Sequence, residues 1–327
     1  LTAESGDVVV SDEILTHSIA KGVGNNTGDG GDVAISAPAG LITIGAGGIA
    51  TRTECVGGGL GNAGIGGDVD LTAAGDITLA GVGINSSALS EGGSAAGGGS
   101  VLLASATGSV DLAGADISAG ATSTTGTAGP AGGIGISTGP GGAIDVGNLL
   151  AHSFAENGAS TGPGGAVTIN TGDALGLGDV YSFSRTSTGL GGDGGDVTVA
   201  LGGSLATTPK ISTMSRGATA AGHGGDVVVD VVGAASFDSI DTSTRLTGDG
   251  VALTSGDVSI TVHNLGGGDG GDELVVAAIS ADAGAWTVPT ATGVAGDAGT
   301  VTLTTEDGPI YVNGAVNTYS GARGTAS

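Results

Sequence analysis

The sequence predicts an all-β fold: a right-handed parallel β-helix with three strands per coil and about ten coils, forming one domain over residues 1–327. Three observations predict it. Three short apolar runs recur in fixed order, at a spacing of 30 to 36 residues with one longer final interval. Glycine, with 72 residues, separates the runs. Aromatic residues are only 2% of the chain, so stacked Val, Ile, Leu and Ala side chains must form the core.

The first strand of each coil follows the loop glycines and shows period-two alternation, the pattern of a β-strand. An apolar residue starts it and a second apolar residue lies two positions later, as in Val33 and Ile35. The predicted strands start at Val33, Val69, Val101, Ile134, Val167, Val197, Val227, Val258 and Val301. An opening part of a coil precedes them, because Leu1-Thr2-Ala3 matches Leu71-Thr72-Ala73.

The second strand follows a turn that often contains glycine, such as Gly40, where a corner requires unusual backbone angles. Its apolar pairs are Ile42/Ile44, Ile77/Leu79, Val110/Leu112, Ile144/Val146, Leu175/Leu177, Leu274/Val276 and Ile310/Val312. The two remaining coils have weaker patterns, for which Leu205 and Phe237 are the best choices.

The third strand starts with an apolar residue and continues with Thr, Ser or Ala at alternate positions, as in Ile49, Thr51 and Thr53. The alternation places these hydroxyls inside the coil. The strand starts are Ile14, Ile49, Ile84, Ile117, Leu149, Val180, Ile211, Ile240, Ile279 and Val316. A loop rich in Gly, Thr, Asn and Asp then leads to the next coil.

Stacked coils would form three parallel sheets and a rod of roughly 48 Å, at about 4.8 Å per coil. The right hand follows the usual crossover rule. A sandwich of antiparallel strands is the alternative fold, but it does not explain three unequal strand types in fixed order. No capping element is visible at either end, so we expect the coils to continue in the same polypeptide or to stack end to end on identical chains.

The charge balance excludes several partners. Seven Lys and Arg residues against 32 Asp and Glu give a formal charge of -25, which disfavours nucleic acid and anionic lipid. No apolar run approaches the roughly 20 residues of a membrane span. The balance favours solubility and divalent cations. Cys55 is the single cysteine, so an internal disulfide is impossible, and we expect it to be a small buried filler.

The repeat unit, Gly-Gly-Asp-Val-x-Ile, a glycine corner, Ile-x-Ile, Ile-x-Thr-x-Ser and a Gly-rich loop, resembles the filamentous-haemagglutinin-like exoproteins, the passengers of two-partner secretion. The resemblance covers nearly the whole chain. It implies a secreted or cell-surface β-helix, a feature that adhesins, matrix fibres and toxin-delivery stalks share. This chain often has Asp where the family has Asn in the loop.

The acidic loops are the candidate metal sites. The motif Gly-Asp-Gly-Gly-Asp occurs three times, and Asp196, Asp226 and Asp257 would stack in consecutive coils. Ca²⁺ bound by carboxylates and loop carbonyls would offset their repulsion, which makes Ca²⁺ the one candidate cofactor. Alternatively, aspartate serves as a turn residue that accepts hydrogen bonds from local N–H groups. The candidate ligands are Asp29, Asp32, Asp193, Asp196, Asp226, Asp257, Asp269 and Asp272.

The outward face of the third strand is the candidate contact face. The basic residues lie on or beside this strand, together with most of the large aromatic residues. Such a concentration favours lateral association or ligand docking, although good strand formers scattered by β propensity would give a similar pattern. The candidate residues are Arg52, Phe154, Tyr181, Phe183, Arg185, Met214, Arg216, Arg245 and Tyr319.

The sequence contains no catalytic constellation. The glutamates are scattered and the four histidines lie in unrelated positions, which disfavours an acid–base pair or a metal triad. The inward hydroxyls disfavour an ice-binding surface. We therefore expect a structural extracellular or cell-surface rod, used as a fibre, stalk or adhesin shaft, whose partners are itself or other surface or matrix components. The alternative is a carbohydrate-binding or carbohydrate-cleaving β-helix.

Overall fold

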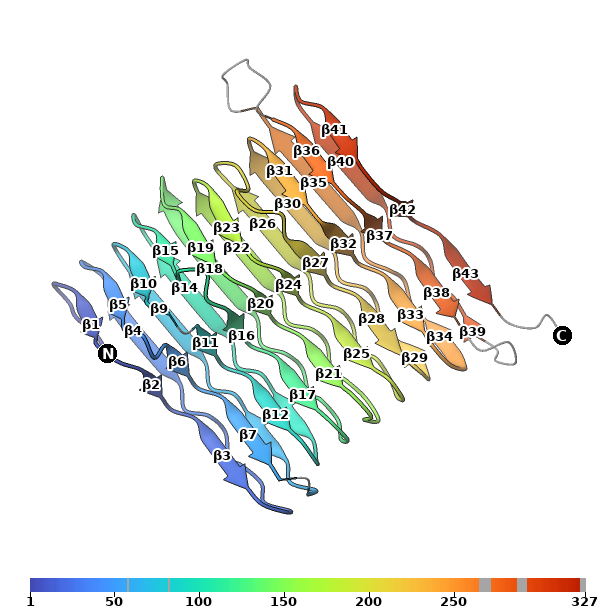
Figure 1. Cartoon of the computed structure of the whole chain (residues 1–327), viewed down its shortest axis with the longest axis horizontal. Coiled ribbons are helices and arrows are strands. Elements are labelled where there is room, and N and C mark those ends of the chain that lie inside the picture. Colours follow the sequence, from blue (N-terminus) through green and yellow to red (C-terminus); the bar gives the residue numbers. More distant parts are fainter. Residues whose placement is uncertain (58, 82, 265–271, 287–292, 324–327) are drawn as a thin grey trace.

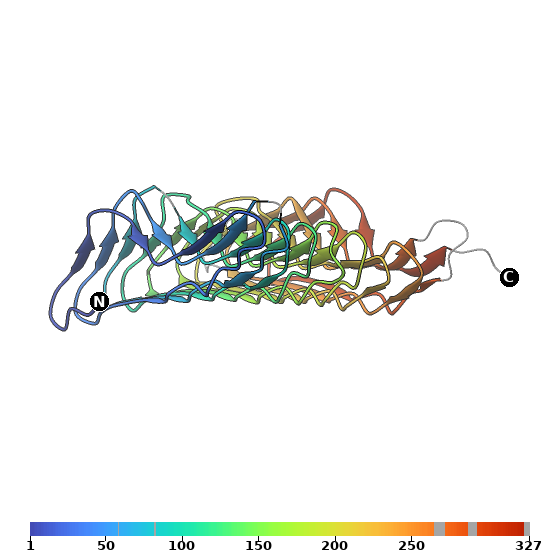
Figure 2. The same cartoon turned by 90° about the horizontal axis from the view of Figure 1, so that it is seen from below.

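The computed structural model describes residues 1–327 except 58, 82, 265–271, 287–292 and 324–327. The described residues form an all-β structure without helices. All their strand pairings join one coil to the next in parallel, so the chain is a β-solenoid of about nine turns. The coils lie side by side along one axis, with the N-terminal and C-terminal coils at opposite ends (Figure 1 and Figure 2). The predicted parallel solenoid is confirmed.

The first sheet contains nine strands, and all nine predicted starts are confirmed. Val33 pairs with Val69, and Val69 with Val101, so identical rungs stack in register. The strands are β4 (Val33–Ala37), β9 (Val69–Ala73), β14 (Val101–Ser105), β18 (Ile134–Pro140), β22 (Val167–Gly172), β26 (Val197–Leu201), β30 (Val227–Val232), β35 (Val258–His263) and β40 (Val301–Thr305).

The second sheet is interrupted once. One part holds β1 (Val8–Val10), β5 (Ile42–Ile44), β10 (Ile77–Leu79), β15 (Val110–Asp111), β19 (Ile144–Val146) and β23 (Leu175–Leu177), and the other holds β31 (Ala235–Phe237), β36 (Leu274–Val276) and β41 (Ile310–Val312). Leu205 connects the parts, because it forms a bridge with Leu175 and its N–H donates to the Ala234 carbonyl. Phe237 lies in the expected strand, in register with Val276, so small Ala235 takes the first apolar position.

The third predicted strand is one leg of the coil divided into two short strands. The third sheet holds its first half: β2 (Ile14–Leu15), β6 (Ile49–Ala50), β11 (Ile84–Asn85), β16 (Ile117–Ser118), β20 (Leu149–Leu150), β24 (Val180–Tyr181), β27 (Lys210–Ser212), β32 (Ser239–Asp241), β37 (Ile279–Ser280) and β42 (Val316–Asn317). The fourth sheet holds its second half: β3 (Ser18–Lys21), β7 (Thr53–Val56), β12 (Ala88–Ser90), β17 (Ala121–Ser123), β21 (Ser153–Ala155), β25 (Ser184–Thr186), β28 (Ser215–Gly217), β33 (Thr244–Leu246), β38 (Ala283–Trp286) and β43 (Ser320–Arg323). Hydrogen bonds between coils continue across the break, from Thr51 N to Asn85 O and from Thr53 N to Ser87 O.

The Gly-rich loops contain short strands that the sequence pattern does not reveal. They are β8 (Ala63–Ile65) with β13 (Ala95–Gly97), and β29 (Ala220–Ala221) with β34 (Gly250–Ala252) and β39 (Gly293–Val294). These loops fold back over the inner side of the third leg. The buried alanines there form small clusters, one of which includes Cys55 beside Ala63, Ala88 and Ala95. The expectation that Cys55 is a buried filler is confirmed.

One continuous apolar core runs through the solenoid from Val33 to Ile279. It consists of the inward residues of the first, second and third sheets, such as Ile35, Ile42 and Ile49. The fourth sheet differs, because its inward residues are mostly small or hydroxylated. The predicted inward hydroxyls are confirmed: Thr51, Thr53, Ser182, Ser184, Thr213, Ser215, Thr242 and Thr244 are all buried.

These buried hydroxyls bind the Gly-rich loop to the third leg. Thr213 Oγ1 donates to the Gly225 carbonyl at 2.6 Å, and Gly225 N donates to the Thr213 carbonyl at 2.8 Å. The same hydroxyl-to-glycine bond joins Thr51 to Gly67 at 2.6 Å, Thr242 to Gly256 at 2.7 Å, and Ser182 to Gly165. These bonds supply hydrogen-bond donors to the carbonyl groups of the loop inside the solenoid, as buried carbonyls require.

We expect Thr213→Val to lower the free energy of unfolding by about 1–3 kcal/mol, because the Gly225 carbonyl loses its buried hydroxyl donor while the side-chain shape is kept. Urea unfolding followed by circular dichroism measures the change. The control is Thr198→Val, because Thr198 points outward from β26 and is exposed. Equal stability of the two variants would show that the hydroxyl bond adds nothing.

Candidate functional site

The outward residues of the third leg form three columns that run along the rod. Residues one coil apart are in register, as Arg185 is with Arg216 and Arg216 with Arg245. Alternation explains the placement: Ser184 and Ser215 point into the coil and are buried, so the arginines beside them point outward. The outward face of the third leg is therefore a regular array in which each coil contributes one residue to each column.

An aromatic–basic cluster occupies this face between β20 and β33. The His152 and Phe183 rings stack with centroids 5.0 Å apart, and Tyr181 contacts Phe183 edge to face at 6.1 Å. The Arg185 guanidinium lies over the Phe154 ring, 5.7 Å from its centroid, within cation–π range. The His152–Phe183 and Arg185–Phe154 contacts link neighbouring coils.

The environment of the cluster shifts the pKa values of His152, Tyr181 and Arg216. Burial lowers the pKa of His152, so its ring is biased towards the neutral form. Burial first, and then the hydrogen bond with Asp179 and its charge, raise the pKa of Tyr181. Burial first, and then the charges of Arg185 and Arg245, lower the pKa of Arg216. The arginine column is thus a place where like charges are held close together.

The structure brings most of the predicted contact residues together and separates two of them. Phe154, Tyr181, Phe183, Arg185, Met214, Arg216 and Arg245 lie in consecutive coils. Arg52 lies several coils away, where it forms an ion pair with Glu54 at 3.1 Å. Tyr319 lies in the last described coil, between β42 and β43. His152, an outward residue of the same predicted face, joins the cluster through its stack on Phe183. The member that the sequence did not predict is Asp241, whose carboxylate pairs with Arg245 at 3.3 Å.

The acidic loop residues form ladders of hydrogen bonds to the backbone. In each case a carboxylate oxygen accepts from a backbone N–H one coil further on. The pairs are Asp29 with Ile65, Asp32 with Asp68, Asp193 with His223, Asp196 with Asp226, Asp226 with Asp257, and Asp257 with Thr300, at 2.6–2.9 Å. This arrangement matches the turn-residue interpretation of the aspartates.

The Ca²⁺ prediction remains untested. Among the described residues, no three His, Cys, Asp or Glu side chains lie together in a group that could hold a metal ion. Asp272 is buried, whereas Asp196 and Asp226 are exposed. Asp269 lies outside the described residues. The second carboxylate oxygens of the ladder remain the atoms that a cation would contact.

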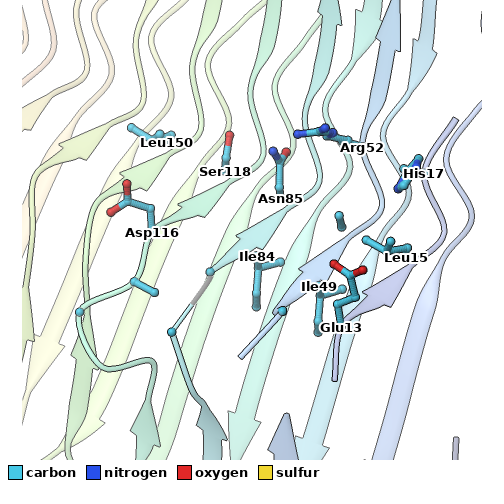
Figure 3. Close-up of a pocket in the computed structure, with 16 residues that line it drawn as sticks. Glu13, Leu15, His17, Ile49, Arg52, Ile84, Asn85, Asp116, Ser118 and Leu150 are labelled. Carbon is cyan, nitrogen blue, oxygen red and sulfur yellow. The ribbon is translucent and has the colours of Figure 1, made fainter. Parts of the chain in front are cut away.

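A groove of about 830 Å³ runs across the N-terminal coils beside the aromatic–basic cluster (Figure 3). Its floor includes outward residues of the third sheet from successive coils, among them Leu15, Asn85, Ser118 and Leu150. Glu13 and Asp116 line it from the turns that precede this sheet, while His17 and Arg52 line it from the residues that follow. The groove thus has a mixed polar and apolar lining, and its last floor residue, Leu150, is in register with Tyr181.

A histidine links three coils on the outer side of the first sheet. His263 Nε2 contacts Asp230 Oδ1 at 2.8 Å, and its Nδ1 contacts Glu306 Oε1 at 3.0 Å. Glu306 Oε2 also accepts from Asn264 N at 3.1 Å. The hydrogen bond with Glu306 is the largest cause that raises the pKa of His263, followed by the charge of Asp230. The same hydrogen bond is the largest cause that lowers the pKa of Glu306.

We expect this contact to stabilise the protein only at acidic to neutral pH. A raised folded-state pKa means that the contribution of His263 is complete below its unfolded pKa of about 6.5 and is lost as the pH rises through the folded value. The melting temperature of the wild type should exceed that of His263→Gln near pH 6, and the difference should shrink by pH 9. A difference that is constant with pH would contradict this assignment. Below about pH 4 the contribution of Glu306 is lost as well.

None of the described residues forms a helix that could cross a membrane. No protein-family model matches this chain, and neither the curated proteins nor the solved structures contain a match. Evidence for the function of this chain therefore comes from the residues on the outer surfaces of the solenoid.

Proposed function

We propose that this chain is a structural, non-enzymatic rod of the extracellular space or the cell surface, used as a fibre, stalk or adhesin shaft. One observation carries the proposal: sheets of nine and ten strands continue in register from coil to coil along the described chain. The aspartate ladders join neighbouring coils, and the hydroxyl-to-glycine bonds fix the Gly-rich loop to the third leg. Repetitive, densely hydrogen-bonded stacking favours a stiff rod that separates its two ends.

The resemblance of the repeat to filamentous-haemagglutinin-like exoproteins supports an extracellular location, as does the charge of -25, which favours solubility. Electron microscopy and small-angle X-ray scattering of the purified chain test the proposal. We expect rigid rods, alone or joined into filaments, with coils stacked at about 4.8 Å. A flexible chain or a compact sphere would rule out a shaft.

Carbohydrate binding is the second candidate function, and one observation favours it. The groove of about 830 Å³ meets the aromatic–basic cluster where Leu150 lies beside Tyr181. Aromatic rings that adjoin a polar groove are suited to pack against sugar rings while the polar groups fix orientation. Retention of a neutral or acidic polysaccharide by the monomeric chain, and its loss in Phe183→Ala, would favour this function over the shaft alone.

We further propose that Ca²⁺ binds weakly along the aspartate ladder of Asp196, Asp226 and Asp257. The stacked carboxylates repel one another, and a divalent cation on their second oxygens would reduce that repulsion. We expect millimolar Ca²⁺ to raise the melting temperature and a chelator to reverse the change. A triple variant with Asp196→Asn, Asp226→Asn and Asp257→Asn loses the three charges but keeps an oxygen acceptor for each backbone N–H. Its melting temperature should no longer respond to Ca²⁺. An unchanged melting temperature of the wild type after chelation would contradict Ca²⁺ binding.

A further inference from the structure

Two charged ladders of opposite sign repeat with the same period on this rod. The arginine ladder consists of Arg185, Arg216 and Arg245, in register on β25, β28 and β33. The aspartate ladder consists of Asp196, Asp226 and Asp257, joined one to the next by bonds from backbone N–H to carboxylate. Both ladders step by one coil, about 4.8 Å, and both span the same part of the rod.

The arginine ladder is incompletely neutralised within its own chain. Arg245 pairs with Asp241 at 3.3 Å. Among the described residues, neither Arg185 nor Arg216 has a carboxylate within ion-pair distance, and the Nε–H of each is buried without a hydrogen-bond acceptor. Phe154 supports Arg185 from one side through its ring. Three guanidinium groups are therefore held in a row with spare donors.

The aspartate ladder has spare acceptors. Asp196, Asp226 and Asp257 each use Oδ1 for a backbone N–H of the next coil and are exposed. Within the described part of the chain, their second carboxylate oxygens carry no hydrogen bond. The three residues line a shallow hollow of about 420 Å³ together with His223 and Thr254. Long arginine side chains from outside can enter such a hollow.

The two ladders lie on opposite faces of the rod. The inward side of the third leg is bonded to the loop backbone, as shown by the Thr213–Gly225 contact. Arg216 points away from that contact on one side, and Asp226 follows Gly225 on the other. One rod therefore cannot join its own ladders, but two neighbouring rods can.

We propose that the arginine ladder of one rod docks onto the aspartate ladder of a second copy, forming lateral assemblies. Equal spacing lets three guanidinium–carboxylate pairs form at once, with the forked geometry that arginine favours. Because the interface joins unlike faces, an assembly of any size keeps a free arginine ladder on one outer side and a free aspartate ladder on the other. Assembly is therefore open-ended and gives rafts or bundles instead of closed dimers.

The net charge of -25 opposes this contact at long range, while the ladders favour it at short range. At about 0.15 M salt the Debye length is about 8 Å, so distant like charges are screened more than pairs in contact. We expect association at that ionic strength and its loss near 1 M salt, where the Debye length is about 3 Å. This interface is an addition to the proposed rod function. It rests on that proposal only because the spacing between coils must be rigid.

The experiment uses two neutralised variants and their mixture. One variant carries Arg185→Gln, Arg216→Gln and Arg245→Gln and keeps the aspartate ladder. The other carries Asp196→Asn, Asp226→Asn and Asp257→Asn and keeps the arginine ladder; asparagine retains the acceptor for the backbone N–H. Light scattering after size-exclusion chromatography, at 0.15 M salt, measures mass as a function of concentration. Circular dichroism confirms that both variants fold.

We expect the wild type to grow beyond the dimer with concentration and each variant alone to associate about tenfold more weakly or worse. The equimolar mixture should form 1:1 dimers and stop there, because each variant supplies one intact ladder. The control Asp70→Asn, Asp111→Asn, Asp145→Asn removes the same charge from exposed positions elsewhere and should assemble like the wild type.

Three results would overturn the inference: a monomeric wild type at high concentration, unchanged association in either variant, or a mixture without heterodimers. Retention of a polyuronate or dextran sulfate by a monomeric wild type, and not by the arginine variant, would reassign the arginine ladder to an acidic polysaccharide. In each case, rod-shaped scattering from the monomer would leave the proposed shaft function standing.

Discussion

Replacing Gly194 with alanine is expected to lower the free energy of unfolding by about 3 kcal/mol, a large effect for the addition of one methyl group. A Cβ at Gly194 would lie 1.7 Å from the Thr213 carbonyl oxygen and 2.8 Å from Gly225 N. Both atoms belong to the backbone, so no side-chain rotation can relieve the clash. The loop would have to move away from the third leg, which would break the hydroxyl-to-glycine bonds described above.

Gly194 represents a whole column of such positions. A Cβ at Gly30, Gly66, Gly98, Gly164 or Gly224 would lie 1.9–2.1 Å from a carbonyl oxygen of the third leg. The high glycine content is therefore a packing requirement of the loop as well as a property of turns. Close approach of two backbones lets the loop and the third leg hydrogen-bond inside the coil, where larger side chains would keep them apart.

Gly28→Ala provides the matched control, because a Cβ at Gly28 meets nothing within 4 Å. This substitution should leave stability unchanged or raise it by up to about 1 kcal/mol, through the lower entropy of the unfolded chain. Urea denaturation followed by circular dichroism compares the two variants. If Gly194→Ala proved as stable as Gly28→Ala, the close packing of loop against leg would be disproved.

The strand positions could be predicted because each coil needs inward apolar residues at alternate positions. Val33 and Ile35 carry that pattern, and so do Ile42 and Ile44 in the next strand. The pattern weakens where a small residue takes the place of a large apolar one. In β31 Ala235 takes the first inward position, so the sequence predicted only Phe237 there. The short loop strands, such as β8 and β29, have no alternation to detect, because close backbone approach selects Gly and Ala at these positions.

The candidate site could be predicted only in part. Alternation showed that Arg185, Arg216 and Arg245 point outward, and equal coil lengths showed that they stack. Contacts between different columns depend on the exact register and on side-chain geometry, which the sequence does not supply. Two such contacts are the Arg245–Asp241 ion pair and the stack of His152 on Phe183. The longest interval between first strands lies after Val258, and the His263–Glu306 contact spans it.

The second large effect is expected at the core of the first sheet. Leu103 is fully buried and stacks between Leu71 of the coil before and Ile136 of the coil after. Leu103→Ala should lower the free energy of unfolding by about 2–5 kcal/mol, the range found for buried leucines whose surroundings relax only partly. Each coil contributes one layer of inward side chains to the core. Few neighbouring side chains can therefore move into the cavity that the substitution leaves.

The neighbouring residue supplies a control in the same strand. Leu102 points outward from β14 and is 46% exposed, so Leu102→Ala should change stability by no more than about 0.5 kcal/mol. Both substitutions remove a leucine side chain from neighbouring positions of one strand. The difference between the two variants therefore measures core packing and not strand propensity. Equal urea midpoints for the two variants would mean that the coils are not held together by their aliphatic columns. The ladders of hydrogen bonds between coils would then have to provide the stability that we assign to the core.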